Sequence, residues 1–441
     1  MTVRTGWWKP SRRLLGDTLL IARGTVIGQA PFVLATPLIT RLFPAAELGI
    51  YGVALAYVGI TAPIAGLRFE LAAISARNEE DARALLVLSA LLIVPVTLAC
   101  TALLCLLKSR AIGSYGALSW WLVALTGATV AAGGAYSTLR SWLARSTRFR
   151  VVANSLTLQG WLRAAIPVLF APVAAGAVLL VSAELAARLS SVLLMARRSG
   201  LYALLAKPRL SAGSLRERAA RFWKYPLLLA PSALIDAAAT LLPVPIVATC
   251  YGLGAAGKFA LVQRLVVLPA ALIVGSVGDV FHAHAANILG QRREAVGGFL
   301  AMTAGRLLLL ATVVYVPVGL LAPFTAGWVF GRQWSDIGIM IAALAPLCIA
   351  QTTVSPISRG LLLSGREERK LIADVVCLVL PLTTLYLTSR WPIIIAITCY
   401  SLAATFANGV YYLIIVQALK RAASPSAPTA EATGDPPRKR T

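Results

Sequence analysis

Five arginines lie inside stretches of the sequence that are otherwise hydrophobic, namely Arg23, Arg163, Arg188, Arg264 and Arg306. An unpaired charge in the middle of such a stretch costs about 2.5–3.5 kcal/mol when the helix inserts into a bilayer. Guanidinium groups bind phosphate and carboxylate oxygens through paired N–H donors. We therefore expect these arginines to face a protein-lined or water-filled interior, where they can hold an anion.

Two of these arginines are the strongest candidates for a substrate site. Arg23 lies close to the middle of the first hydrophobic stretch, and Arg264 lies in the outer half of the eighth. Both are predicted to bind an anionic substrate, because a charge at that depth does not reach water easily. An internal role stays open for Arg23, since Asp17 precedes it by six residues and offers a partner.

Arg163 and Arg306 are predicted as further substrate contacts. Arg163 has a possible partner in Glu184 on the next stretch, and Glu184 precedes Arg188 by four residues, which favours a helical ion pair. A structural ion cluster and a substrate site therefore both stay open at this place. Arg306 lies nearer the cytoplasmic end of its stretch, where reaching toward water explains it equally well.

Acidic residues are rare within the hydrophobic stretches. Asp236 lies near the centre of the seventh and is the candidate for coupling transport to H+ or Na+, with a counter-ion role as the alternative. Arg68 and Glu70 flank the inner end of the second stretch and are interpreted as a solvated charged turn. Glu47 is interpreted as a helix-start residue outside the membrane.

Metal and cofactor chemistry is not expected. His282 and His284 are two residues apart, so on a helix their rings point about 200° away from each other. The six cysteines show no paired CxxC spacing and resemble small hydrophobic residues. We expect no metal, no cofactor and no catalytic residue.

The amino-acid composition predicts the kind of structural element that positions these residues. The chain has 441 residues, 58% hydrophobic and 13% charged, with a mean hydropathy of +0.78. Soluble domains are about 25% charged, so the sequence predicts an all-α polytopic membrane protein with about twelve transmembrane helices. The predicted spans are 14–40, 47–70, 84–107, 118–142, 152–172, 175–196, 225–250, 256–287, 299–322, 335–362, 370–389 and 392–418.

The basic residues indicate how the chain crosses the membrane. The net charge is +24, and most of the 41 Lys and Arg fall in loops that share one side when the N-terminus is cytoplasmic. This positive-inside pattern predicts cytoplasmic N- and C-termini and removes the reason to expect nucleic-acid binding. The spans leave no loop long enough for a soluble catalytic domain, so we do not expect an enzyme.

Two parts of the sequence match when one is shifted by 208 residues. Pro37, Phe43, Gly49 and Tyr51 then align with Pro245, Tyr251, Gly257 and Phe259. An offset near half the length predicts two six-helix bundles related by a pseudo-two-fold axis along the membrane normal. The predicted parts are a first bundle (1–196), a basic and partly amphipathic linker suited to anionic headgroups (197–224), a second bundle (225–419) and a disordered basic tail (420–441).

Two short motifs carry a family resemblance. The turn Thr40-Arg41-Leu42-Phe43-Pro44-Ala45-Ala46-Glu47-Leu48-Gly49-Ile50-Tyr51 and the segment Leu67-Arg68-Phe69-Glu70-Leu71-Ala72-Ala73-Ile74 resemble Wzx-type oligosaccharide flippases. These belong to the polysaccharide transporter family, in the superfamily that includes the multidrug and toxic compound extruders. Together with the stretch that begins at Ala22-Arg23-Gly24-Thr25, the resemblance covers about sixty residues.

The resemblance implies a transporter of the bacterial cytoplasmic (inner) membrane. It would flip an undecaprenyl-diphosphate-linked oligosaccharide (such as an O-antigen unit in lipopolysaccharide or other polysaccharide biosynthesis) to the periplasmic leaflet by alternating access. Membrane lipids, a coupling ion (H+ or Na+) and polysaccharide biosynthesis proteins are the expected partners. An ion-coupled drug or toxin exporter is one rival, disfavoured because cationic drugs need an acidic pocket. A membrane polysaccharide polymerase or ligase is another, disfavoured because every predicted outer loop is short.

Overall fold

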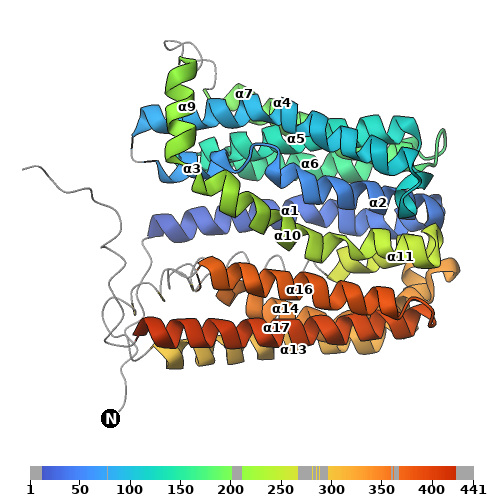
Figure 1. Cartoon of the computed structure of the whole chain (residues 1–441). Coiled ribbons are helices and arrows are strands. Elements are labelled where there is room, and N and C mark those ends of the chain that lie inside the picture. Colours follow the sequence, from blue (N-terminus) through green and yellow to red (C-terminus); the bar gives the residue numbers. More distant parts are fainter. Residues whose placement is uncertain are drawn as a thin grey trace, which may run out of the picture. The chain divides into compact units, whose positions relative to one another are not determined.

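The computed structural model describes residues 12–76, 78–200, 211–266, 296–358 and 367–423, together with 281, 285, 288 and 361. Within these residues every regular element is helical, which confirms the predicted all-α class (Figure 1). The backbone of Arg23 lies in the first helix, whereas its side chain is outside the described part.

The described helices follow the predicted spans in order. Their bounds are α1 (Arg12–Leu42), α2 (Ala45–Thr61), α3 (Phe69–Ser75), α4 (Glu79–Ser109), α5 (Trp120–Arg145), α6 (Phe149–Phe170), α7 (Ala177–Arg198), α9 (Ala212–Arg221), α10 (Ala230–Leu241), α11 (Pro243–Tyr251), α13 (Val296–Phe330), α14 (Ile337–Ser358), α16 (Glu367–Leu387) and α17 (Ile393–Ala423). Shorter helical turns are η1 (Ala62–Ile64), η2 (Gly113–Ala117), η3 (Tyr225–Leu229) and η5 (Arg332–Trp334). A further helical segment covers 253–266.

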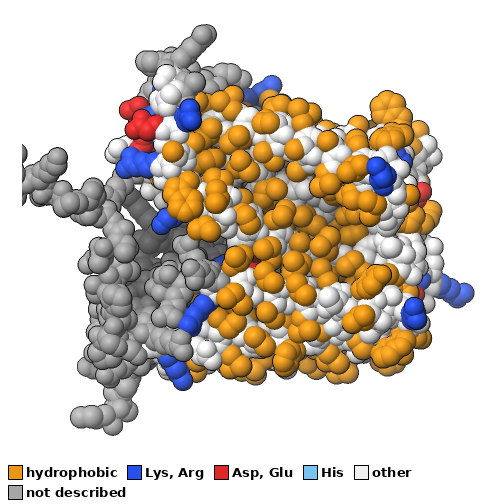
Figure 2. All heavy atoms as spheres, viewed as in Figure 1, with side chains coloured by type: hydrophobic (Ala, Val, Ile, Leu, Met, Phe, Trp, Pro, Cys, Tyr) orange, Lys and Arg blue, Asp and Glu red, His pale blue; other side chains and the backbone are white. Residues whose placement is uncertain are grey.

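The chain is a multi-span membrane protein. Among the described residues 8 helices are long and apolar enough to cross a membrane, or up to 9 if the bent pair Tyr225–Leu241 and Pro243–Tyr251 forms one span. Helices α1 and α6, with 31 and 22 residues, and the segment 253–266 occupy the remaining predicted positions. The face of the molecule in Figure 2 is mostly hydrophobic along the helices, while charged side chains gather at the helix ends.

The second span is not the continuous helix that hydropathy predicts over 47–70. Helix α2 ends at Thr61, and the chain passes through η1 to Leu67 and Arg68, whose φ angles are 48° and 62°. Such left-handed conformations are strained for residues other than glycine. Gly66 precedes them, and a Cβ there would lie 2.2 Å from the Ser89 hydroxyl. This glycine therefore lets the broken segment pack against α4.

The seventh span is also bent, by 41° where α10 meets α11. Pro243 begins α11. Because proline lacks an N–H and its ring crowds the preceding turn, it removes a helical hydrogen bond and bends the helix.

The helices form two compact units. Unit 1 contains Met1–Leu268 and Ala322–Met340, and unit 2 contains Pro269–Leu321 and Ile341–Thr441. The predicted bundle boundary at 197–224 stays a prediction.

Small residues bring α1 and α6 together within unit 1. A Cβ added at Gly24 would lie 2.6 Å from the Ala153 Cβ, and one added at Gly28 would lie 2.5 Å from the Leu156 carbonyl oxygen. On the other side, a Cβ at Gly160 would overlap the carbonyl of Gly28. This small-xxx-small arrangement lets two membrane helices approach backbone to backbone.

A second close contact joins α2 to the segment 253–266. A Cβ at Gly49 would lie 1.9 Å from the Leu253 carbonyl oxygen, and a Cβ at Gly257 would lie 1.9 Å from the Ala45 carbonyl oxygen. The shift of 208 residues that aligns Gly49 with Gly257 also aligns Ala45 with Leu253, so each contact is the counterpart of the other. Helices related by the predicted pseudo-two-fold axis would show this reciprocity.

Turns between spans also contact the ends of α1 and α11. The Thr40 carbonyl oxygen accepts hydrogen bonds from the side chains of Gln333 and Trp334 in η5, at 3.0 and 2.8 Å. On α11, the Thr249 hydroxyl accepts a hydrogen bond from the backbone N–H of Ser114 in η2 at 2.9 Å. Both helix ends are therefore held by a turn.

Unit 2 packs around α13, α14, α16 and α17. Its buried hydrophobic core includes Leu300, Ile357 and Ile415. Asp374 on α16 is buried, accepts a hydrogen bond from Tyr411 on α17 at 3.1 Å and pairs with Lys370 at 2.6 Å. The carboxylate is therefore neutralised within the helix pair.

A buried cationic cluster in unit 1

Glu184 is the centre of an ionic cluster in unit 1. It lies on α7, and its side chain is 2% exposed. Arg163 on α6 contacts both carboxylate oxygens, with Nη2 donating to Oε1 at 2.9 Å and Nε lying 2.7 Å from Oε2. This paired contact joins α6 to α7. It is the structural ion cluster that the sequence leaves open as an alternative to a substrate site.

Arg188 completes the pairing from the same helix as Glu184. Its Nε donates to Glu184 Oε1 at 2.8 Å, one helical turn away. The guanidinium extends toward α5, where a Cβ at Gly133 would lie 3.0 Å from Arg188 Nη1. The side chains of Arg163 and Arg188 are 16% and 19% exposed, so neither guanidinium is fully enclosed.

Arg264 is the third arginine of this region and comes from the segment 253–266. Its Cζ lies 3.5 Å from the centre of the Phe32 ring on α1, and its Nη1 donates to the Tyr51 hydroxyl on α2 at 3.3 Å. Its charge also acts on Glu184. A guanidinium stacked flat on an aromatic face keeps its N–H edge available for an anion.

The cluster carries an excess of positive charge. Arg163, Arg188 and Arg264 act on the single carboxylate of Glu184, which leaves a formal charge of +2. Charges in a low-dielectric interior interact strongly, and an unbalanced one is costly. An anion with two ionised oxygens would balance the arginines while accepting hydrogen bonds from their free N–H groups.

The structure brings together only part of the predicted site. Arg264 and Arg163 fall in the cluster with Arg188. Arg306 lies on α13 in unit 2, where its side chain is exposed. The Arg23 side chain lies outside the described residues, although its backbone shares α1 with Phe32. Roles for Arg23 and Arg306 in substrate binding stay predictions.

Asp236 lies on α10 and is exposed rather than enclosed. It interacts electrostatically with Arg68 at the break in the second span. Its proposed role in ion coupling is neither supported nor opposed by this position.

The interpretation of Arg68 and Glu70 as a solvated turn is wrong for Glu70. The Glu70 side chain is only 3% exposed, lies 3.9 Å from Arg68 and accepts a hydrogen bond from Ser89 at 3.4 Å. The helix break turns Glu70 inward, and hydropathy alone does not reveal such a break.

Phe32 and Tyr51 were not predicted as site residues. Hydrophobic periodicity assigns both to helix packing, and only the fold places them beside Arg264. Glu47 lies in the first turn of α2, as predicted, and its carboxylate also accepts the backbone N–H of Ala177 at 2.6 Å, at the start of α7.

Comparisons with known proteins identify the fold. No family model matches the sequence, and no curated protein matches it. Among solved structures, the lipid II flippase MurJ in an inward closed conformation has a TM-score of 0.71 at 14% identity, covering 92% of this chain and 87% of that chain. A multidrug resistance MATE family transporter of the MOP superfamily, in an inward-facing conformation, has a TM-score of 0.62 at 18% identity, covering 93% and 96%.

A third similar structure is a MOP superfamily transporter from Pyrococcus furiosus, described as having a binding pocket of reversed polarity. It has a TM-score of 0.61 at 15% identity and covers 92% of this chain and 95% of that chain. The chain thus has the twelve-helix fold of these transporters.

Proposed function

We propose that this protein flips an undecaprenyl-diphosphate-linked oligosaccharide from the cytoplasmic to the periplasmic leaflet of the inner membrane. The observation that carries the proposal is the excess of arginine over carboxylate around Glu184. A diphosphate that links a lipid to a sugar has one ionised oxygen on each phosphorus, which matches the formal +2 of the cluster. Fixed guanidinium groups would lower the cost of moving that charge through a low-dielectric layer.

Glu184 has a defined part in this proposal. Without a carboxylate between them, Arg163 and Arg188 would repel each other, and their side chains would turn apart. Glu184 holds both within 3 Å of its oxygens while the remaining N–H groups stay available. The carboxylate therefore preorganises the cationic groups for a larger anion.

The comparisons support a transporter more than an enzyme. MurJ is described as a lipid II flippase and the MATE structures as multidrug transporters, and this chain shares their fold over more than nine-tenths of its length. Transport in the proposed mechanism alternates between inward-open and outward-open states. The contact between Gly49 and Gly257 lies at the predicted outer end of unit 1 and would have to loosen in the outward-open state.

A drug exporter of the same superfamily is the alternative within this fold. Organic cations would be repelled by the cluster, and Glu184 is already shared by two arginines. A polysaccharide polymerase or ligase would need acceptor-binding groups outside the membrane, for which the predicted outer loops are short. Asp236 is proposed as the residue that couples H+ or Na+ to transport, with its interaction with Arg68 linking it to the broken second span.

Purified protein in proteoliposomes can distinguish these functions. A fluorescent polyprenyl-diphosphate oligosaccharide placed in both leaflets is reduced from outside, so that the protected fraction reports leaflet transfer. The proposal expects protein-dependent transfer, and expects the same lipid carrying a neutral linker in place of the diphosphate not to be transferred. Uptake of a quaternary ammonium dye without transfer of the diphosphate lipid would favour the drug exporter. Growth of the glycan would favour the polymerase.

A further inference from the structure

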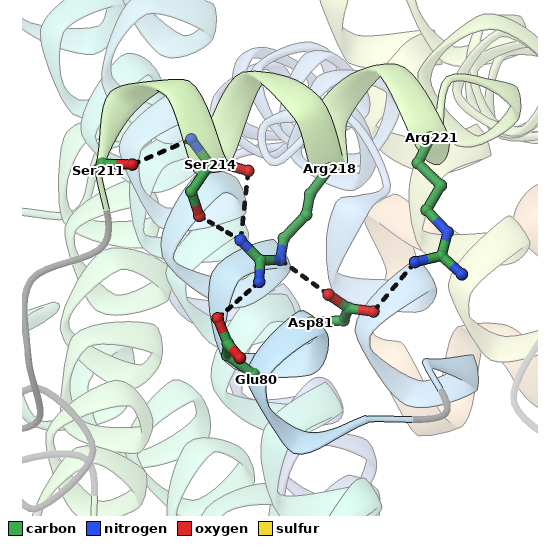
Figure 3. Close-up of polar contacts among 6 residues, drawn as sticks. All are labelled: Glu80, Asp81, Ser211, Ser214, Arg218 and Arg221. Atoms are coloured by element: carbon green, nitrogen blue, oxygen red, sulfur yellow. Dashed lines mark hydrogen bonds and ion pairs between the residues drawn. The ribbon is translucent and has the colours of Figure 1, made fainter.

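Helix α9 is fixed to the end of unit 1 by an ionic contact with the first turn of α4 (Figure 3). Arg218 donates to Glu80 Oε1 at 2.7 Å and to Asp81 Oδ1 at 2.8 Å, and Arg221 lies 3.5 Å from Asp81 Oδ2. Ser211 caps the helix by accepting the backbone N–H of Ser214 at 3.2 Å. The linker helix thus has a defined position beside α4 (Figure 1).

Aromatic residues after α9 strengthen this attachment. Phe222 and Tyr225 pack against the buried cluster formed by α3 and α4, and the Tyr225 hydroxyl lies 2.7 Å from the Ser75 hydroxyl. The end of α9 is therefore held from two directions, by charge on one side and by apolar packing on the other.

Three cations, one in the middle of α9, one at its end and one after it, are exposed to solvent. Arg216 and Lys224 are exposed, and within the described part of the chain neither forms an ion pair. The Arg221 side chain is 70% exposed, makes the longer contact with Asp81 and lies over the Phe222 ring, with its Cζ 5.9 Å from the ring centre. Arg218 makes the shorter contacts with the acidic first turn of α4, so the three exposed cations can contact another anion.

The neighbouring residues place these cations at the membrane boundary. Trp223 is 47% exposed, and it lies two residues before the start of Tyr225–Leu241, the first part of the bent membrane span. The side chain of Leu227, within that part, is also exposed. Exposed Trp beside Lys and Arg at the start of a membrane helix is typical of the headgroup region.

From this arrangement we infer that Arg216, Arg221 and Lys224 form a binding site for the phosphate of an anionic phospholipid headgroup. The three cations supply the charge complementarity, Trp223 sets the depth, and the Arg218 contact with Glu80 and Asp81 fixes the helix that carries them. Under the predicted topology the lipid belongs to the cytoplasmic leaflet. The site is separate from the cluster around Glu184, so it does not depend on the proposed transport substrate.

The test uses the full-length protein in nanodiscs that contain equal amounts of phosphatidylglycerol and phosphatidylcholine, one of which is brominated. Bromine quenches nearby tryptophan, and subtracting the Trp223→Phe protein isolates the signal from Trp223. We expect brominated phosphatidylglycerol to quench at least about fivefold more effectively than brominated phosphatidylcholine, since each cation at headgroup depth adds about a fivefold preference. The triple substitution R216Q/R221Q/K224Q should abolish the preference.

Two control proteins keep the result interpretable. R216K/R221K retains all three charges and should retain the preference. R110Q/R332Q/R390Q removes three exposed cations from predicted outer loops and should leave it unchanged. Equal quenching by both lipids in the unmodified protein would overturn the inference. It would also be overturned if the outer-loop variant lost as much preference as R216Q/R221Q/K224Q.

Discussion

Gly49 on α2 and Gly257 in the segment 253–266 each lie against the backbone of the other helix. A Cβ added at Gly49 would lie 1.9 Å from the Leu253 carbonyl oxygen, and a Cβ added at Gly257 would lie 1.9 Å from the Ala45 carbonyl oxygen. Membrane helices associate closely where small residues let their backbones meet. The pair therefore joins equivalent helices of the two sequence repeats at a contact that tolerates no side chain.

Replacing either glycine with alanine should destabilise the protein. Both added methyl groups would meet a carbonyl oxygen of the backbone rather than a flexible side chain, so G49A and G257A should each cost about 1–3 kcal/mol by overpacking. Thermal unfolding in detergent measures the change. Gly254 is the matched control, because nothing lies within 4 Å of a Cβ placed there. Equal melting temperatures for G257A and G254A would contradict the close contact.

Removing the carboxylate of Glu184 should both destabilise the protein and weaken anion binding. E184Q leaves Arg163 and Arg188 without their shared partner, and breaking a buried ion pair in this way costs about 3–5 kcal/mol. E217Q on α9 removes an exposed carboxylate instead and should change little. Thermal unfolding with and without a short polyprenyl diphosphate provides the readout.

The diphosphate should raise the melting temperature of E184Q less than that of the unmodified protein, because Arg163 and Arg188 are then no longer held together by a shared carboxylate. If E184Q were as stable as E217Q, Glu184 would not hold the cluster together. An unchanged response to the diphosphate would separate the cluster from substrate binding.

The Phe32 ring should position Arg264 for its ligand. F32L removes the aromatic face 3.5 Å from the guanidinium, with an expected loss of about 0.5–2 kcal/mol of diphosphate binding. F32Y keeps an aromatic face and should bind nearly as well as the unmodified protein. Titration of the short polyprenyl diphosphate measures both variants. If F32L and F32Y weakened binding equally, stacking would not explain the role of Phe32.

The contact between Arg218 and α4 should hold the linker helix over a wide pH range. The hydrogen bond to Asp81 raises the pKa of Arg218 above its ordinary value. A raised pKa preserves the charged form until the pH exceeds it, so Arg218 should stay charged from about pH 6 to about pH 9. Protection factors for hydrogen exchange in 211–229, corrected for the pH dependence of intrinsic exchange, should stay constant across this range and should fall in R218Q. A much lower protection factor in the unmodified protein at the upper end of this range than at the lower end would contradict this account.

Sequence reasoning predicts the helices and their order because an apolar stretch of about twenty residues has few alternatives in a bilayer. It also identifies Arg163, Glu184 and Arg188 as one group, since Glu184 and Arg188 are one turn apart. It does not predict that Arg264 meets Phe32, because that contact joins residues more than two hundred positions apart. Hydropathy likewise misses the break before Glu70, where the strained backbone of Leu67 and Arg68 ends a continuous apolar run.

Leaflet transfer by R264A tests the central claim most directly, namely that the half-buried arginines of the cluster carry a diphosphate across the membrane. Arg264 is not paired with Glu184 through a hydrogen bond, so its removal should leave the α6–α7 contact intact. The measurement compares transfer of the fluorescent diphosphate lipid by R264A, R264K and R110A in proteoliposomes with equal amounts of folded protein. We predict at least about a tenfold loss for R264A, the effect of one charge-assisted hydrogen bond, with partial transfer by R264K and full transfer by R110A. Transfer by R264A at the rate of R110A would contradict the claim.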